Sequence, residues 1–166
     1  MEKIYLGIDP GNSGAFALLF PGKEEVYDFE DGDTLNYLQM LSAAPRIQPV
    51  EALMERVGAM PKQGVSSTFK FATNFGRWIG RLEALDISFG FVIPRKWQGH
   101  MFGSTPKIFM IRKGIKKLNT KAMSLEVARG LFPKCRDQLT RKKDADRADA
   151  LLIAEYCRRL DKGARI

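Results

Sequence analysis

The segment Lys3–Asp9 and the turn after it constrain the fold of this chain more than any other stretch. Aliphatic residues occupy every second position of this segment, which is the two-residue period of a β-strand. The turn at positions 10–14 contains a proline and two glycines, which permit a tight reversal. An apolar run, Ala15–Phe20, follows directly and predicts a second strand paired with the first. The sequence therefore places one carboxylate, Asp9, at the end of a strand and beside a glycine turn.

The rest of the chain predicts an α/β fold with a five-stranded mixed sheet flanked by helices. Three strands form an antiparallel meander, and two later strands join the sheet in parallel. The later strands are predicted at Glu25–Phe29, Val50–Glu55 and Asp86–Ile93. Helices are predicted from Asp33 or Thr34 to a stop at Ala44-Pro45, from about Ser66 to Ala84, from Thr120 to Phe132, and from Asp144 to Leu160.

The length of 166 residues suits one domain covering the whole chain. Gly99–Asn119 lacks a clean period, so we expect a loop or poorly ordered insert there, with a short helix around Ile108–Ile111. No apolar run reaches the ~20 residues that span a bilayer, and no signal peptide is evident. Two cysteines give neither a disulfide framework nor a metal spacing, which favours reduced thiols in a cytoplasmic protein.

The net charge of +8 is unevenly distributed. From Met101 to Lys143 there are 12 Lys or Arg and two acids, a balance of 12 − 2 = +10. From Met1 to Met60 there are 4 bases and 10 acids, a balance of 4 − 10 = −6. A block this basic indicates a polyanionic partner, and nucleic acid is the first candidate.

Two acids stand at the ends of predicted strands, Asp9 after the first and Glu55 after the fourth. The last predicted helix adds two more. At ~100° per residue, Asp146 and Asp149 lie within about 80° of arc of that helix's apolar residues. Asp144 lies roughly 160° away, so we expect it to cap or support the helix. Acids on a core-facing stripe cost several kcal/mol unless they are paired or bind metal.

Pairing and metal binding remain open as explanations of these acids. Four bases close to the last helix could pair with them: Arg141, Lys142, Lys143 and Arg147. Alternatively, the four carboxylates converge at the strand ends and are neutralised by divalent cations. Oxygen-only ligands suit Mg²⁺ or Mn²⁺ rather than zinc, and two such ions about 4 Å apart could clamp a phosphodiester displacement.

The helix predicted after the fourth strand carries an aromatic stripe. Phe75 and Trp78 recur at helical spacing and are expected in the core. Phe69 and Phe71, near the helix start, are better placed for stacking on bases. Trp97 could pack in the core or stack on a nucleotide, and the core is favoured.

Three segments resemble the RuvC family of Holliday junction resolvases, which has the RNase H-like fold. They are Gly7–Gly14, the strand-terminal Glu55, and Asp146–Ala154. The short chain, Trp97 and the segment 131–133 look more like the phage-borne branch of that family. The resemblance implies a homodimer in the cytoplasm of a bacterial or phage-infected cell, which nicks two strands of a four-way DNA junction.

By this resemblance, Asp9, Glu55, Asp146 and Asp149 are the catalytic acids that bind two Mg²⁺ ions, with Mn²⁺ as a substitute. In bacterial members an aromatic residue follows the second acid by three positions, but Gly58 stands there. Its role is therefore vacant or has moved to Phe69 or Phe71. Lys121 matches a basic residue that could hold the scissile phosphate. Backbone contacts are predicted for Lys62, Lys70, Arg77, Lys116 and Lys117.

Other functions remain as alternatives. A nuclease of broader range would cut flaps, forks or three-way junctions. The turn after Asp9 also resembles the phosphate loop of actin-like ATP-binding proteins, but those need two lobes and more than twice this length. A catalytically inactive nucleic-acid-binding module is a third class, which the presence of all four acids disfavours.

Overall fold

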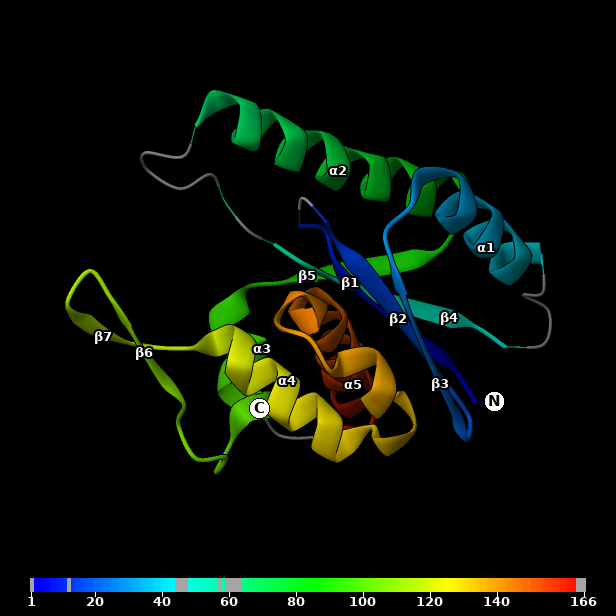
Figure 1. Ribbon diagram of the computed structural model, residues 1–166. Helices are drawn as coiled ribbons and strands as arrows, with labels where there is room; N and C mark the ends of the chain where they lie inside the picture. The colour runs from blue at the N-terminus through cyan, green and yellow to red at the C-terminus, as the bar shows by residue number, and fades with distance from the viewer. Residues whose placement is uncertain (1, 12, 44–47, 57, 59–63, 164–166) are drawn as a thin grey trace.

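A five-stranded mixed sheet forms the centre of the computed structural model (Figure 1), which describes all residues except 1, 12, 44–47, 57, 59–63 and 164–166. The strand order is β3-β2-β1-β4-β5. The first three strands are antiparallel neighbours, whereas β4 is parallel to β1 and β5 is parallel to β4. This arrangement confirms the predicted sheet. The strands are β1 Ile4–Asp9, β2 Ala15–Phe20, β3 Lys23–Asp28, β4 Val50–Glu55 and β5 Ser88–Val92.

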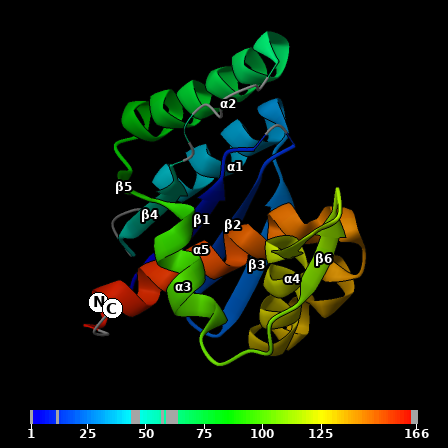
Figure 2. The same cartoon turned by 90° about the vertical axis from the view of Figure 1, so that its left-hand side faces the viewer.

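Helices cover both faces of the sheet (Figures 1 and 2). On one face lie α1 Asp31–Ala43 and α2 Val65–Ala84, and on the other lie α3 Pro94–Phe102, α4 Thr120–Leu131 and α5 Ala145–Asp161. Two short 3₁₀ helices, at 133–139 and 142–144, precede α5. Successive residues of β1 point to opposite faces of the sheet, so the core has two parts. Leu6 packs with Trp78 of α2, whereas Tyr5 packs on the α5 side.

Helix α5 runs antiparallel to β1 and lies very close to it. An ideal Cβ on Gly7 would sit 2.2 Å from the Ala150 carbonyl oxygen and 2.3 Å from the Ala154 nitrogen. Only glycine fits there, since real Cβ atoms do not approach backbone so closely. At the far end of the same face, the Tyr5 hydroxyl donates to Asp161 Oδ2 over 2.8 Å. The first turn of α5 therefore lies at the end of β1 where Asp9 is found.

Two helix starts differ from the sequence prediction. Helix α1 begins at Asp31, before the predicted caps, and Thr34 Oγ1 instead accepts a hydrogen bond from the Glu30 N–H. Helix α4 is capped by Asn119, whose side chain accepts from the Ala122 N–H over 3.1 Å. The predicted stop of the first helix at positions 44–45 lies outside the described residues.

The prediction for Gly99–Asn119 as a loop with a short helix is wrong. Helix α3 continues to Phe102, and a hairpin follows, with β6 at Phe109–Arg112 and β7 at Ile115–Leu118. The connecting residues Lys113 and Gly114 both have positive φ, 52° and 74°. Positive φ at both central positions is typical of two-residue hairpin turns. The Lys113-Gly114 pair is thus the local sequence signal of the hairpin turn.

Both cysteines, Cys135 and Cys157, are buried free thiols, as the sequence predicted. Among the described residues, no helix combines the length and apolar character needed to cross a membrane.

Candidate active site

The sheet register places Asp9 beside Glu55. Strand β1 pairs in parallel with β4 through Ile8 and Met54, so the next residue of each strand is a carboxylate at the same edge. Both carboxylates lie on the face covered by α5, because alternate strand residues share a face. Each is about 8% exposed. The two strand-end acids of the sequence analysis therefore meet in the structure.

Helix α5 brings Asp146 and Asp149 to the same place. Burial raises the pKa of Asp9 to about 7, and the charges on Glu55 and Asp146 add to the rise. Burial also raises the pKa of Asp149 well above its usual range, and the charge on Asp9 is the next cause. The four acids thus form one electrostatic cluster, which we call the carboxylate cluster. Its like charges disfavour full ionisation.

Each of the first two carboxylates is held by one short contact. Asp9 Oδ1 accepts a hydrogen bond of 3.0 Å from the Gly11 N–H of the glycine turn. Glu55 Oε1 accepts one of 2.7 Å from Trp97 Nε1. Burial raises the pKa of Glu55, and the hydrogen bond from Trp97 opposes this rise. Trp97, on α3, is fully buried, which confirms its assignment to the core and adds a polar role.

The two α5 carboxylates differ in their surroundings. Asp146 accepts from the Ser13 hydroxyl over 2.5 Å and pairs with Lys121 Nζ at 3.3 Å. Burial lowers the pKa of Lys121, but the charges of the nearby acids outweigh it and raise that pKa. Asp149 Oδ1, in contrast, is buried and makes no hydrogen bond within the described part of the chain, although the buried Ser124 hydroxyl of α4 lies near this carboxylate and opposes the rise in its pKa. This oxygen is therefore available to a ligand.

The donor set fits a hard divalent cation. Ionised carboxylates supply only oxygen acceptors, which Mg²⁺ and Mn²⁺ prefer. Asp149 Oδ1 is a buried oxygen without a partner in the described residues, and such atoms are rare in folded proteins. However, no three Asp, Glu, His or Cys side chains of the described residues are already placed to hold one ion together. The carboxylates must turn toward an ion in order to coordinate it.

Two solved structures share the fold of this chain. A structure described as "T. thermophilus RuvC in complex with Holliday junction substrate" aligns with a TM-score of 0.61 over 97% of each chain, at 14% identity. A second one, "Thermus thermophilus RuvC structure", aligns with a TM-score of 0.56 over 97% of each chain, at 15% identity. The chain has the RuvC fold. At the sequence level, no family model and no curated protein matches it.

Two arginines that could have neutralised the acids of α5 contact other carboxylates in this RuvC fold. Arg141 pairs with Asp144 at 2.8 Å, and Arg147 pairs with Asp28 at 2.6 Å. The idea that these arginines neutralise the α5 acids is therefore wrong, since Lys121 contacts Asp146 instead. Asp144 also accepts from the Arg141 N–H, so it stabilises the turn before α5, as expected of a supporting group.

Apart from Lys121 of α4, the predicted DNA-contacting residues that the structure describes lie on two elements, α2 and β7. On α2, Phe69 is 73% exposed, whereas Phe71 is partly buried and stacks on Phe75 with ring centroids 6.1 Å apart. Phe69 is thus the better candidate for base stacking. Lys70 and Arg77 are exposed on α2, and Lys116 and Lys117 are exposed on β7. Lys62 lies outside the described residues.

Sequence reasoning missed three contributors to the site. Ser13 binds Asp146, Trp97 binds Glu55, and Asn74 Nδ2 of α2 donates to the Gly11 carbonyl over 3.1 Å. Ser13 could have been suspected from its place in the glycine turn. The other two contacts join distant segments, and nothing local in the sequence marks them.

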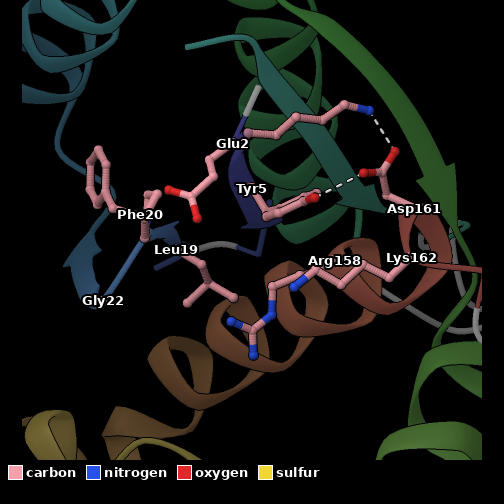
Figure 3. Close-up of a pocket in the computed structure, with 10 residues that line it drawn as sticks. Glu2, Tyr5, Leu19, Phe20, Gly22, Arg158, Asp161 and Lys162 are labelled. Carbon is pink, nitrogen blue, oxygen red and sulfur yellow. Dashed lines mark hydrogen bonds and ion pairs between the residues drawn. The ribbon is translucent and has the colours of Figure 1, made fainter.

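A hollow of about 460 Å³ lies at the opposite end of β1 (Figure 3). Tyr5, Leu19 and Arg158 are among its lining residues. Asp161, which also lines it, already accepts hydrogen bonds from both Tyr5 and Lys3. This hollow is remote from the carboxylate cluster and does not contribute to it.

Proposed function

We propose that this protein is a divalent-metal-dependent endonuclease that cuts branched DNA, with the four-way junction as its main substrate. The observation that carries the proposal is the convergence of Asp9, Glu55, Asp146 and Asp149 from three elements into one cluster, with Asp149 Oδ1 unpartnered among the described residues. The fold of a RuvC solved with a Holliday junction substrate supports the choice of DNA structure.

The four carboxylates would hold Mg²⁺, or Mn²⁺ in its place. Divalent ions, when bound, supply the positive charge that offsets the acids and lowers the pKa of an attacking water. The remaining residues orient the cluster: Trp97 fixes one oxygen of Glu55, and Ser13 fixes one oxygen of Asp146. These contacts would limit the range over which Glu55 and Asp146 turn when they move onto an ion.

Lys121 would contact the scissile phosphate. Its side chain is 60% exposed although Nζ reaches Asp146, so the ammonium group is accessible to a phosphate from solvent. Its raised pKa keeps it charged at neutral pH. An ammonium at this place stabilises the additional negative charge that develops as the phosphodiester is cut.

The proposal includes a homodimer, because two symmetric nicks need two clusters and the described chain provides one. Helix α2 offers a surface for it, since a Cβ on Gly76 or Gly80 would meet nothing within 4 Å. These glycines therefore do not serve contact with the sheet. Phe69 would stack on an unpaired base at the branch point. The protein would act in the cytoplasm of a bacterial or phage-infected cell.

A panel of labelled substrates tests the proposal: a four-way junction, a three-way junction, a flap and a linear duplex, each with Mg²⁺ or with a chelator. We expect paired nicks in the four-way junction, slower cutting of the other branched forms, and no cutting in chelator. Asp146→Asn should bind the junction with unchanged affinity but cut at least 100-fold more slowly. Near wild-type cutting by this variant would overturn the site assignment.

A further inference from the structure

The hairpin at residues 107–118, which we call the basic hairpin, is an antiparallel two-stranded ribbon. Four residue pairs hold β6 to β7, from Phe109 with Leu118 to Arg112 with Ile115. A further bond closes its base, where the Asn119 N–H donates to the Ile108 carbonyl over 2.8 Å. A two-residue turn, Lys113-Gly114, joins the two strands at the tip.

All charged residues of the basic hairpin are positive. Residues 103–120 contain no acid and five bases: Lys107, Arg112, Lys113, Lys116 and Lys117. All eight strand residues are exposed, including Ile111 at 79% and Ile115 at 59%. On one face Lys116 Nζ lies 4.4 Å from the centre of the Phe109 ring. Both faces mix cationic and apolar groups, because each strand alternates its side chains between them.

The base of the basic hairpin is joined to the carboxylate cluster. Asn119 follows β7 directly and caps α4, and Lys121, two residues later, contacts Asp146. The Ile108 N–H also donates to Met123 Sδ of α4 over 3.3 Å. Figures 1 and 2 show the hairpin projecting from the body beside α4. A substrate that reaches the cluster therefore passes close to the hairpin.

We propose that the basic hairpin enters the major groove of a duplex arm next to the cut site. This rests on the proposed function, since it assumes a DNA substrate. The major groove of B-DNA is wide enough to admit a two-stranded β-ribbon, whereas β-ribbon proteins that use the minor groove kink the duplex. The hairpin would enter by its tip, so that cationic side chains on its two faces meet phosphates on the opposite groove walls. Ile111 and Ile115, on opposite faces close to the turn, would then lie near base edges and thymine methyl groups. A second copy of the hairpin is a poor occupant because like charges repel.

The test compares wild type with Lys116→Ala/Lys117→Ala, in chelator so that nothing is cut. Removing one lysine that binds a phosphate should lower the slope of log affinity against log salt by about 1, so we expect a slope smaller by about 2 and at least tenfold weaker binding. The matched control Lys23→Ala/Lys162→Ala removes the same charge at the opposite end of the sheet and should change neither quantity by more than about twofold. Lys116→Arg/Lys117→Arg should retain the wild-type slope.

Two further measurements address the groove itself. Wild type should protect guanine N7 in one arm from methylation, and the alanine variant should lose that protection. Glucosylated 5-hydroxymethylcytosine in the arms fills the major groove and should weaken DNA binding by the wild type at least tenfold, but binding by the alanine variant much less.

Three outcomes would overturn the inference. Unchanged salt slope and N7 protection in an alanine variant that still cuts junctions would overturn the groove contact but not the proposed nuclease. A wild type that neither binds nor cuts junctions would overturn both. A changed molecular mass of the alanine variant in light scattering would assign the hairpin to a protein contact and overturn the inference.

Discussion

Trp97 and Glu55 lie 42 residues apart in sequence, yet the indole N–H donates a 2.7 Å hydrogen bond to the carboxylate within the buried part of the site. The indole is the donor that fixes the orientation of Glu55. Its loss would leave a buried carboxylate free to turn away from an ion.

Trp97→Phe should therefore reduce cleavage at least tenfold and increase the Mg²⁺ concentration needed for half-maximal rate. A hydrogen bond to a charged group contributes about 1.5–3 kcal/mol. Trp78→Phe is a matched control, because Trp78 is also fully buried but its Nε1 has no partner among the described residues. Both variants should lose similar packing energy, so equal effects on the Mg²⁺ titration would refute the positioning role.

The metal-free protein should become less stable as pH rises. Burial raises the pKa of Asp9 to about 7 in the folded protein, above the ~3.9 of an unfolded aspartate. The folded state then binds the proton more tightly, so the stabilising contribution is full below pH ~4 and is lost as pH rises toward 7. Thermal unfolding in chelator should show a falling Tm from pH 5 to pH 8.

Two additions sharpen this experiment. Asp9→Asn removes the charge and should raise the metal-free Tm at pH 8 by roughly 5 °C, with little effect at pH 5. Mg²⁺ should raise the wild-type Tm more at pH 8 than at pH 5, because it binds the ionised acids. The carboxylates of Asp28 and Asp144 have lowered pKa values and affect stability only at more acidic pH. A Tm independent of pH over this range would contradict the clustering.

Lys121→Met should slow cutting by at least tenfold while leaving junction affinity within about threefold. The substitution removes the ammonium beside Asp146 but keeps most of the aliphatic chain. A residue that acts on the reacting phosphate affects kcat more than binding. Single-turnover cleavage and fluorescence anisotropy separate the two quantities. Lys117→Ala should show the reverse pattern, weaker binding with little change in the rate of the bound complex.

Gly7→Ala should destabilise the protein by about 3 kcal/mol or more, since its methyl group would overlap the backbone of α5. Gly99→Ala of α3 is the control, because a Cβ there meets nothing within 4 Å and the residue lies outside the proposed dimer surface. A helix-interior glycine changed to alanine should gain about 0.5–1 kcal/mol in stability. Urea unfolding measures both. A neutral Gly7→Ala would show that β1 and α5 are not held as closely as described.

The sheet and the acids were predictable because their signals are local. Strand alternation fixed Asp9 and Glu55 at strand ends, and the helical period placed Asp146 and Asp149 on one stripe. The partners of the bases were not predictable, since Arg147 contacts Asp28 from 119 residues away. The basic hairpin was missed because its strands are exposed on both faces and so show no alternation of apolar and polar residues.

The missing side chain at Gly7 has a consequence for how such a site can evolve. Because strand and helix touch backbone to backbone there, no side chain at this contact can adjust the separation of β1 and α5. The separation of the two elements that carry Asp9, Asp146 and Asp149 is therefore set by the main chain. Surrounding loops, lysines and aromatic residues can be exchanged for new substrates while the separation of β1 and α5, which carry three of the four acids, stays the same.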